Sequence, residues 1–336
     1  MENSTKKNAR IITFAETGEP DVLKIKTVEI PAPGPLEVRI RVKAMGLNRA
    51  DAMFRRGQYI ENPVFPARLG YEASGIVDAI GSDVSQVQVG DIVSVVPAFS
   101  LNKYATHGEL IVVPAYTVEK HPETLSFEQA ASLWTVYMTA YGMVVDTAKT
   151  SKGQFVVINA ASSGVGLAAI QTVKAVGAVP IAITTTASKK AALISAGADH
   201  VIITSQQDVT AEILRITNGT GANTLLDAVG GELLALIIPA MAFHGKVYIY
   251  GTLSPEKTTI AAMDILSKAL QVSGFLVNEV SSDEKRQRAG KDFIYSGLAS
   301  GKLKPLIAKV FAFEDFVEAH KYLESNQQVG KVIVTV

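Results

Sequence analysis

Between residues 155 and 277, apolar runs of strand length alternate with stretches of helical periodicity, and this alternation restricts the possible folds more than any other feature of the chain. Near-continuous apolar strands are typical of a parallel sheet that is covered by helices on both faces. The pattern predicts a doubly wound α/β sheet of six parallel strands. The strands are expected at 155–159, 179–185, 200–204, 224–229, 246–251 and 272–277, and helices at 165–176, 188–196, 209–217, 232–243 and 263–269.

Residues 10 to 120 have a different pattern, in which short β-branched runs are separated by turns rich in Gly and Pro. This part of the chain is predicted to be an all-β barrel or sandwich. The pattern changes at Ser126, which is expected to cap a helix together with Gln129 three residues later. A last strand is expected at 331–336, and because no partner lies nearby in sequence, it is expected to return to the first domain.

The segment from Asn159 to Leu167 directly follows the first apolar run and opens a helix. Small residues at such a turn let the backbone approach a pyrophosphate, and the helix N-terminus supplies N–H donors. The match to G-x-G-x-x-G is incomplete, because Ala161 and Ser163 replace the first two glycines. We interpret the turn as a dinucleotide-binding loop, the alternative being a tight turn that binds nothing. Its expected cofactor contacts are Ala161, Ser162, Ser163, Gly164, Val165 and Gly166.

The second apolar run ends in Thr184 and Thr185, and no acidic residue follows it closely. A carboxylate there would accept hydrogen bonds from a ribose 2′-hydroxyl and favour NAD. Ser188 and Lys189 begin the next helix instead, where hydroxyl and ammonium groups can bind a 2′-phosphate. We therefore expect NADPH as cofactor, bound in part by Thr184, Thr185, Ser188 and Lys189. In the alternative interpretation, Lys189 belongs to a solvated helix face.

The chain contains no Cys, which excludes disulfides, Cys nucleophiles, thiolate zinc sites and Cys-ligated iron–sulfur clusters. With 32 Lys and Arg against 32 Asp and Glu, it has no global basic field for nucleic acid or an anionic membrane. The polar first ten residues lack the apolar core of a signal peptide, and no later stretch reaches about 18 apolar residues. We expect a soluble, cytoplasmic protein that binds neither nucleic acid nor membrane.

Several motifs, in this order and spacing, resemble the medium-chain dehydrogenase/reductase superfamily, specifically its zinc-free NADPH:quinone oxidoreductase branch. The resemblance implies a chaperonin-10-like (GroES-like) β-barrel catalytic domain at 1–125 and 278–336, and a Rossmann domain at 126–277. It also implies an active site in the cleft between these domains, and a homodimer paired through the sixth strand. The motifs are Gly46–Asp51, Gly70-Tyr71-Glu72, Val89–Val93, Thr139-Ala140-Tyr141, Ala160–Gly166, Ala196–Asp199 and Gly330-Lys331-Val332.

Zinc-dependent members of this superfamily carry Gly-His-Glu where this chain has Gly70-Tyr71-Glu72. Tyrosine is a poor substitute for imidazole as a zinc ligand, and no Cys is present, so we expect no metal. Without a Lewis acid, hydride donation to an already electron-poor acceptor remains feasible. The resemblance therefore implies a reductase of quinones or other activated α,β-unsaturated carbonyls. A 2-alkenal or enoyl-thioester reductase and a non-catalytic NADPH-binding protein remain alternatives.

The resemblance also suggests roles for single residues. Asn48 is expected beside the nicotinamide ribose and the substrate, and Thr139 at the nicotinamide end of the cofactor. Many quinone reductases have Tyr five residues after this Asn, where this chain has Met53, so Tyr59 and Tyr71 are candidate proton donors, with water or simple packing as alternatives. Phe54, Phe99, Trp134 and Tyr137 are expected either to line an acceptor pocket or to lie in the core. Further cofactor contacts are expected from Gly251, Thr252, Phe275 and Leu276, and Lys331 is expected near the adenosine phosphates.

Overall fold

The computed structural model describes residues 6–336, and its contacts divide the chain into two compact units. The first comprises Met1–Thr135 and Pro305–Val336, and the second comprises Val136–Lys304. Residues 126–135 thus pack with the first unit and residues 278–304 with the second. The boundaries expected from the resemblance, at 125 and 278, stay a proposal about functional domains.

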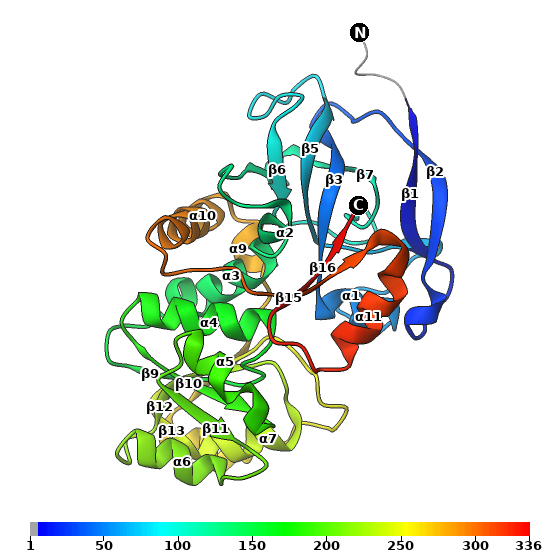
Figure 1. Cartoon of the computed structure of the whole chain (residues 1–336). Helices are drawn as coiled ribbons and strands as arrows, with labels where there is room; N and C mark the ends of the chain where they lie inside the picture. Colours follow the sequence, from blue (N-terminus) through cyan, green and yellow to red (C-terminus); the bar gives the residue numbers. More distant parts are fainter. Residues whose placement is uncertain (1–5) are drawn as a thin grey trace. The chain divides into compact units, whose positions relative to one another are not determined.

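The first unit is rich in β-structure, as predicted (Figure 1). One sheet has the strand order β15-β16-β3-β5-β6-β8, with β7 paired to β3, and a second sheet has the order β2-β1-β4. The strands are β1 (Lys7–Phe14), β2 (Lys24–Ile30), β3 (Glu37–Leu47), β4 (Ala67–Arg68), β5 (Glu72–Ile80), β6 (Ile92–Val95), β7 (Leu110–Pro114), β8 (Val118–Lys120), β15 (Ile307–Ala312) and β16 (Lys331–Thr335).

The last strand returns to the first unit, as expected from the sequence. β16 pairs antiparallel with β3, with Val332 opposite Leu47, and parallel with β15. Among the described residues, three α-helices belong to this unit and a fourth crosses its boundary. Ser126 caps α2 by accepting a hydrogen bond from the backbone N–H of Gln129. The helices are α1 (Arg49–Arg55), α2 (Phe127–Ala130) and α11 (Phe316–Glu324), and the boundary helix is α3 (Trp134–Tyr141).

The second unit contains the predicted six-stranded parallel sheet, in the order β11-β10-β9-β12-β13-β14. This order reverses direction at β9, which is the topology of doubly wound nucleotide-binding sheets. Buried aliphatic side chains from its strands and helices, such as Val157, Ile181 and Leu225, form one core. The strands are β9 (Phe155–Ile158), β10 (Val179–Thr184), β11 (His200–Ile203), β12 (Ala222–Asp227), β13 (Met241–Ile249) and β14 (Gln271–Gly274).

The helices of the second unit begin close to the predicted positions, but one ends early. The helix predicted over 232–243 stops at Ile237, and after a short 3-10 turn β13 begins at Met241. Pro239 explains the difference, because proline lacks the N–H that an α-helix needs. The helices are α4 (Gly164–Ala175), α5 (Lys190–Ser195), α6 (Val209–Ile216), α7 (Gly231–Ile237), α8 (Ala262–Lys268), α9 (Asn278–Ser281) and α10 (Glu284–Ala299), with a π-helical segment at Gly142–Thr147.

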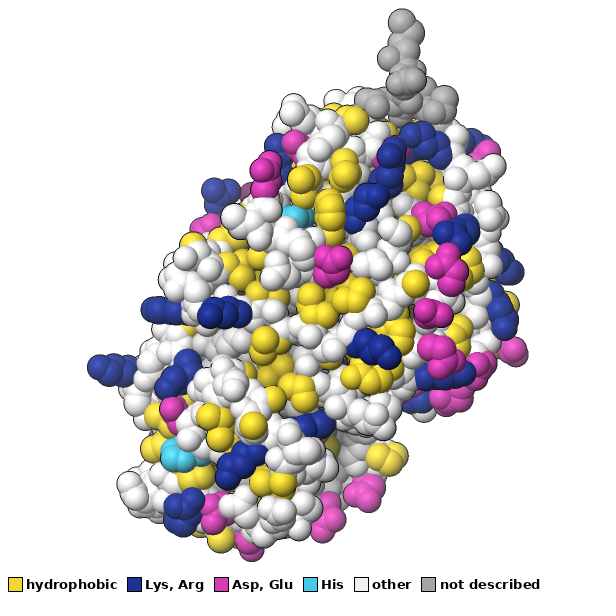
Figure 2. Space-filling view, viewed as in Figure 1, with side chains coloured by type: hydrophobic (Ala, Val, Ile, Leu, Met, Phe, Trp, Pro, Cys, Tyr) yellow, Lys and Arg dark blue, Asp and Glu magenta, His cyan; other side chains and the backbone are white. Residues whose placement is uncertain are grey.

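The surface carries both signs of charge. On the face drawn in Figure 2, basic and acidic side chains are interspersed. No helix within residues 6–336 is long and apolar enough to cross a membrane.

Candidate active site

Four polar side chains meet in the interior of the first unit, and we call them the Asn48 cluster: Asn48, Asp51, Glu72 and Lys331. Asn48 is the N-cap of α1, Asp51 lies in the first turn of that helix, and Glu72 and Lys331 begin strands β5 and β16. All four are buried. The pairing of β3 with both β5 and β16 brings these distant parts of the sequence together.

The cluster fixes the orientation of the Asn48 side chain. Its Nδ2 donates to the backbone oxygen of Gly46 and to Oε1 of Glu72, both at 3.2 Å. Its Oδ1 accepts a hydrogen bond of 2.5 Å from Nζ of Lys331, which also donates to Glu72. Glycine is required at position 46, because a Cβ there would lie 2.0 Å from the backbone oxygen of Ala131.

The two carboxylates of the cluster have different surroundings. Glu72 accepts from the Lys331 ammonium and, through Oε2, from the backbone N–H of Thr135 at 3.0 Å. Asp51 accepts through Oδ2 from the backbone N–H of Asn48 at 2.8 Å, whereas its buried Oδ1 has no partner among the described residues. Burial raises the pKa of Asp51 to about 7. The Asn48 cluster therefore contains one ion pair and one carboxyl group that can hold a proton near neutral pH.

Lys331, which was expected near the adenosine phosphates, lies in the Asn48 cluster of the first unit. Its side chain is only 4% exposed, and its ammonium group donates to Glu72 and to Asn48. Lys331 is thus a partner of Asn48 and Glu72, and its predicted contact with the adenosine phosphates stays a prediction.

The candidate proton donors Tyr59 and Tyr71 contact each other. Their ring centroids are 6.2 Å apart, and Tyr71 also packs against Phe99 at 5.9 Å. Tyr71 is buried, whereas Tyr59 is partly exposed. Burial raises the pKa of both hydroxyl groups. Both are therefore protonated at neutral pH, and Tyr59 is the one of the two that solvent reaches more readily.

Several predicted site residues lie in the core. Phe54 belongs to the main apolar cluster of the first unit, and Trp134 is buried with its Nε1 donating to Ser94 at 2.8 Å. Tyr137, in the second unit, donates its hydroxyl hydrogen bond to Gln171 at 2.8 Å. Of the two interpretations offered for these aromatic residues, core packing describes these three.

The predicted dinucleotide-binding turn of the second unit has the geometry that such a turn needs. Ser163 caps α4, and its Oγ accepts from the backbone N–H of Gly166 at 3.0 Å. A Cβ on Gly166 would lie 2.6 Å from the backbone oxygens of Ala160 and Ala161, so the helix can follow the strand this closely only with glycine. Ala160 has a positive φ of 44°. The turn thus presents N–H groups of the first turn of α4, of which that of Gly166 is already bonded to Ser163.

Lys189 lies against this turn, since its Nζ donates to Oγ of Ser162 at 3.1 Å. Thr185 and Ser188 are exposed after the end of β10, and Thr184 is buried. Hydroxyl groups and one ammonium group therefore surround the end of β10, where a carboxylate would stand in an NAD-binding site.

Three polar residues, Asn159, Asp227 and Tyr250, lie beside the turn, and the sequence reasoning did not single out Asp227. Asn159 donates through Nδ2 to the buried Asp227 and accepts from the backbone N–H of Ala228 at 2.7 Å, which joins the ends of β9 and β12. Burial and the nearby Asp227 raise the pKa of the Tyr250 hydroxyl, and Ser163 lowers it. This hydroxyl forms no hydrogen bond of ordinary geometry among the described residues. Asn159 directly follows β9 and Asp227 is the last residue of β12, so a polar residue at the end of each of these neighbouring strands was the available sequence signal.

The remaining predicted cofactor contacts lie in varied surroundings. Gly251 and Thr252 follow β13, and Leu276 is 44% exposed. Phe275 is buried against Gly142, where a Cβ would come within 2.4 Å of its ring, and Thr139 is buried in α3. Phe275 is therefore packed inside the second unit, and the contacts predicted for these five residues stay predictions.

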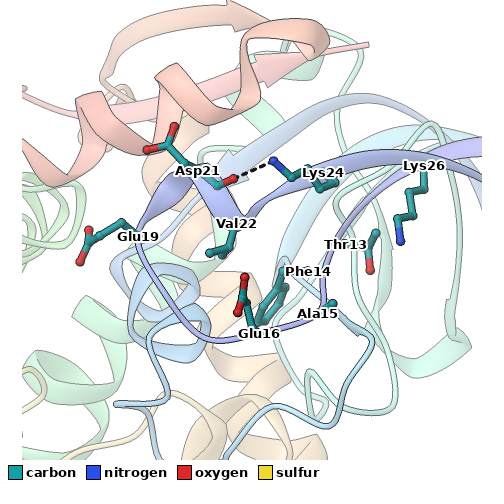
Figure 3. Close-up of a pocket in the computed structure, with 9 residues that line it drawn as sticks. All are labelled: Thr13, Phe14, Ala15, Glu16, Glu19, Asp21, Val22, Lys24 and Lys26. Atoms are coloured by element: carbon teal, nitrogen blue, oxygen red, sulfur yellow. Dashed lines mark hydrogen bonds between the residues drawn. The ribbon is translucent and has the colours of Figure 1, made fainter.

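Two other features bear on the site. Within residues 6–336, no three His, Cys, Asp or Glu side chains are grouped as metal ligands would be. A cavity of about 320 Å³ lies at the loop between β1 and β2, and Figure 3 shows the nine residues that line it, from Thr13 to Lys26. None of the Asn48 cluster lines that cavity. The candidate functional residues are therefore the Asn48 cluster in the first unit and, separately, the turn before α4 in the second unit.

Comparison with known proteins identifies the family. Residues 34–180 match the family described as alcohol dehydrogenase GroES-like domain, and residues 164–290 match zinc-binding dehydrogenase. A human synaptic vesicle membrane protein VAT-1 homolog is 32% identical over 320 residues, covering 90% of this chain and 80% of its own length. Two solved quinone oxidoreductases align over nearly the whole of both chains. The Pseudomonas syringae protein has 30% identity, a TM-score of 0.89 and coverage of 98% and 100%. The Escherichia coli protein complexed with NADPH has 27% identity, a TM-score of 0.90 and coverage of 97% and 100%.

The chain belongs to the medium-chain dehydrogenase/reductase superfamily, in its zinc-free quinone oxidoreductase branch. This confirms the family and the enzyme type predicted from the motifs. The match to the GroES-like domain and the six-stranded sheet together confirm the predicted fold class. As a member of this branch, the chain is an oxidoreductase with a GroES-like part and a Rossmann part.

Proposed function

We propose that the chain is an NADPH-dependent, metal-independent reductase that transfers hydride to a quinone or another activated α,β-unsaturated carbonyl. The observation that carries the proposal is the turn before α4, with its capped helix N-terminus and the adjacent Lys189. It is supported by the quinone oxidoreductase structure that contains NADPH and superposes over nearly the full length of the chain.

The residues around the turn fit a dinucleotide phosphate. The first N–H groups of α4 favour an anion. The buried hydroxyl of Tyr250, which forms no hydrogen bond of ordinary geometry among the described residues, is a donor that a phosphate oxygen would satisfy. We assign the diphosphate to residues 161–166 and the 2′-phosphate to Lys189, with Thr185 and Ser188 as hydroxyl donors. The assignments of Thr139, Gly251, Thr252, Phe275 and Leu276 to the nicotinamide side remain part of this proposal.

When bound, reduced nicotinamide supplies a hydride, and the acceptor takes one further proton to complete its two-electron reduction. Asn48 contributes little to that proton transfer, because both Nδ2 hydrogens are used by Gly46 and Glu72. Its Oδ1 accepts from Lys331, and we assign this oxygen to accept a further hydrogen bond from a ligand hydroxyl. Tyr59 is our proton donor, with Tyr71 as its hydrogen-bonding neighbour.

A metal has no place in this proposal, because the Asn48 cluster already holds a cation. The ammonium of Lys331 neutralises Glu72, whose motif position in zinc-dependent relatives follows a histidine ligand. We propose that the acceptor must therefore be activated by its own conjugation. Zinc analysis of the purified protein tests this: stoichiometric zinc, with activity lost to a chelator, would contradict it.

We also propose a cytoplasmic homodimer that pairs through β14. This strand is at the edge of its sheet and its residues are largely exposed. Large apolar side chains in the same unit are exposed as well: Phe243 at 67%, Met263 at 66% and Leu266 at 72%. Unpaired strand edges and clustered apolar surface favour association with a second copy. A monomer in sedimentation at micromolar concentration would oppose this.

NADPH oxidation across quinones, enones, 2-alkenals and enoyl thioesters tests the function as a whole. We expect turnover with quinones or enones. Turnover confined to enoyl thioesters would favour the narrower enoyl-reductase alternative, and NADPH binding with no turnover would favour a non-catalytic protein.

A further inference from the structure

Tyr59, the proton donor of the proposed reductase, lies in the loop 57–66 between α1 and β4. Among the described residues, no backbone-to-backbone hydrogen bond involves residues 59–65. Apolar burial does not hold the middle of this loop either, because Ile60 is 62% exposed and Val64 is 70% exposed. The position of the Tyr59 hydroxyl therefore depends on contacts made by side chains.

Glu61 makes the most of these contacts. Its carboxylate accepts three hydrogen bonds, and all of the donors belong to one short segment of the loop between β6 and β7. The donors are Oγ of Ser100 at 2.5 Å, the backbone N–H of Leu101 at 2.8 Å and Nδ2 of Asn102 at 3.5 Å. Hydrogen bonds to an ionised carboxylate are stronger than those between neutral groups.

Asn102 completes the connection from the opposite side. Its Nδ2 donates to the backbone oxygen of Asn62 at 2.8 Å, and its Oδ1 accepts from the backbone N–H of Val64 at 2.9 Å. We call the contacts of Glu61 and Asn102 the Glu61 clasp. The clasp joins the middle of the loop 57–66 to a segment about 40 positions later in the sequence.

The same two loops also meet through aromatic rings, with Tyr71 between them. Tyr59 contacts Tyr71 at 6.2 Å between ring centroids, and Phe99 contacts Tyr71 from the second loop at 5.9 Å. Tyr71 is buried, and it directly precedes Glu72 of the Asn48 cluster. The Tyr59 ring therefore packs against a fixed partner, and the clasp holds the backbone that carries this ring.

We propose that Glu61 is a positioning residue of the reductase, whose carboxylate holds the loop 57–66 so that the Tyr59 hydroxyl meets the acceptor. This inference rests on the proposed function. In that reaction NADPH supplies the hydride, the Tyr59 O–H proton goes to the acceptor, and water returns a proton to the phenolate. Proton transfer needs heavy atoms within about 3 Å, so a small displacement of the loop is enough to slow it.

The test compares Glu61→Gln with Glu318→Gln, a matched control that removes a carboxylate of the same unit. Glutamine keeps the size of the Glu61 side chain but leaves one oxygen for three donors. The control residue Glu318 is 64% exposed and pairs on the surface with Lys321 at 3.0 Å. Asn102→Ala, at an exposed position, opens the clasp from the other side and serves if Glu61→Gln does not fold.

The first measurement needs no substrate. The full chain is labelled with meta-fluorotyrosine, and Tyr59→Phe assigns the fluorine resonance of that residue. In the wild type this resonance should differ from its position in urea, because neighbouring rings shift it. Glu61→Gln should move it toward the position in urea, and Asn102→Ala should do so by less. Glu318→Gln should leave it unchanged.

The second measurement is steady-state turnover with an acceptor that supports NADPH oxidation. Glu61→Gln should lower kcat by about 10–100-fold, the loss that a displacement of about 1 Å can cause. KM for NADPH should not change. In a Tyr59→Phe background, Glu61→Gln should cause no further loss, because the group that it positions is absent. Glu318→Gln should keep the wild-type kcat.

The inference is overturned if the Tyr59 resonance stays in place in both Glu61→Gln and Asn102→Ala. It is also overturned if the losses from Glu61→Gln and Tyr59→Phe multiply in the double variant, because Glu61 then acts by another route. A wild type that oxidises NADPH with no acceptor defeats the proposed function, and this inference with it. An unmoved resonance in an active enzyme defeats this inference alone.

Discussion

Replacing Lys331 by Met tests whether the Asn48 cluster depends on its buried ion pair. Methionine keeps most of the length and apolar character of the lysine stem but removes the ammonium group. Glu72 is fully buried, so its carboxylate would lose the one charged partner that it has within residues 6–336, and Asn48 would lose the donor to Oδ1. Breaking a buried pair on one side costs about 3–5 kcal/mol. For a domain of this size each kcal/mol corresponds to roughly 2–4 °C.

The chain has a single Trp, and Trp134 is buried in the first unit, so its fluorescence reports on the unit that contains the pair. We expect Lys331→Met to lower the free energy of unfolding, obtained from the urea and thermal transitions of this signal, by about 3–5 kcal/mol. Adding Glu72→Gln should recover much of the loss, because the uncompensated charge is then removed. A cost below about 1 kcal/mol, the range of exposed pairs, would refute the reasoning.

Three further predictions concern the pH response and the nucleotide turn. The pKa of Asp51 is raised to about 7 in the folded state, so the protonated carboxyl group stabilises the fold at low pH, and this stabilisation is lost as the pH rises from about 4 through about 7. Urea titrations at several pH values should show this decline in the free energy of unfolding, and Asp51→Asn should flatten it. Lys189→Ala should weaken NADPH binding by about 10–100-fold, because one charge-assisted hydrogen bond is lost, and it should leave NADH binding unchanged. Calorimetry measures both affinities, and equal losses for the two nucleotides would oppose a 2′-phosphate contact. Gly166→Ala should weaken both nucleotides together, because its Cβ would meet two backbone oxygens at 2.6 Å; unchanged affinities would show that the turn binds neither.

The alternation of apolar runs and helical stretches was sufficient to predict the parallel sheet, because both its period and its strand lengths are local properties. Helix ends depend on single residues, and Pro239 ended α7 earlier than the periodicity indicated. β15 was not predicted, since its burial is only partial and its register depends on the distant β16.

The candidate site was predictable where function depends on one local segment. The turn at Ala160–Gly166 has a local signature, and Ser163 and Gly166 perform the expected conformational roles. Lys331 could not be placed this way, because its environment is created by strand pairing across the chain with Asn48 and Glu72. The contact of Glu61 with Ser100 and Leu101 is likewise a property of the folded chain.

Oxidation of NADPH by the purified protein with a quinone or enone, before and after treatment with a chelator, tests the central claim most directly. The account predicts turnover with at least one such acceptor, faster with NADPH than with NADH and undiminished by the chelator. Absence of turnover with every acceptor, or activity that disappears with the chelator and returns with zinc, would contradict it.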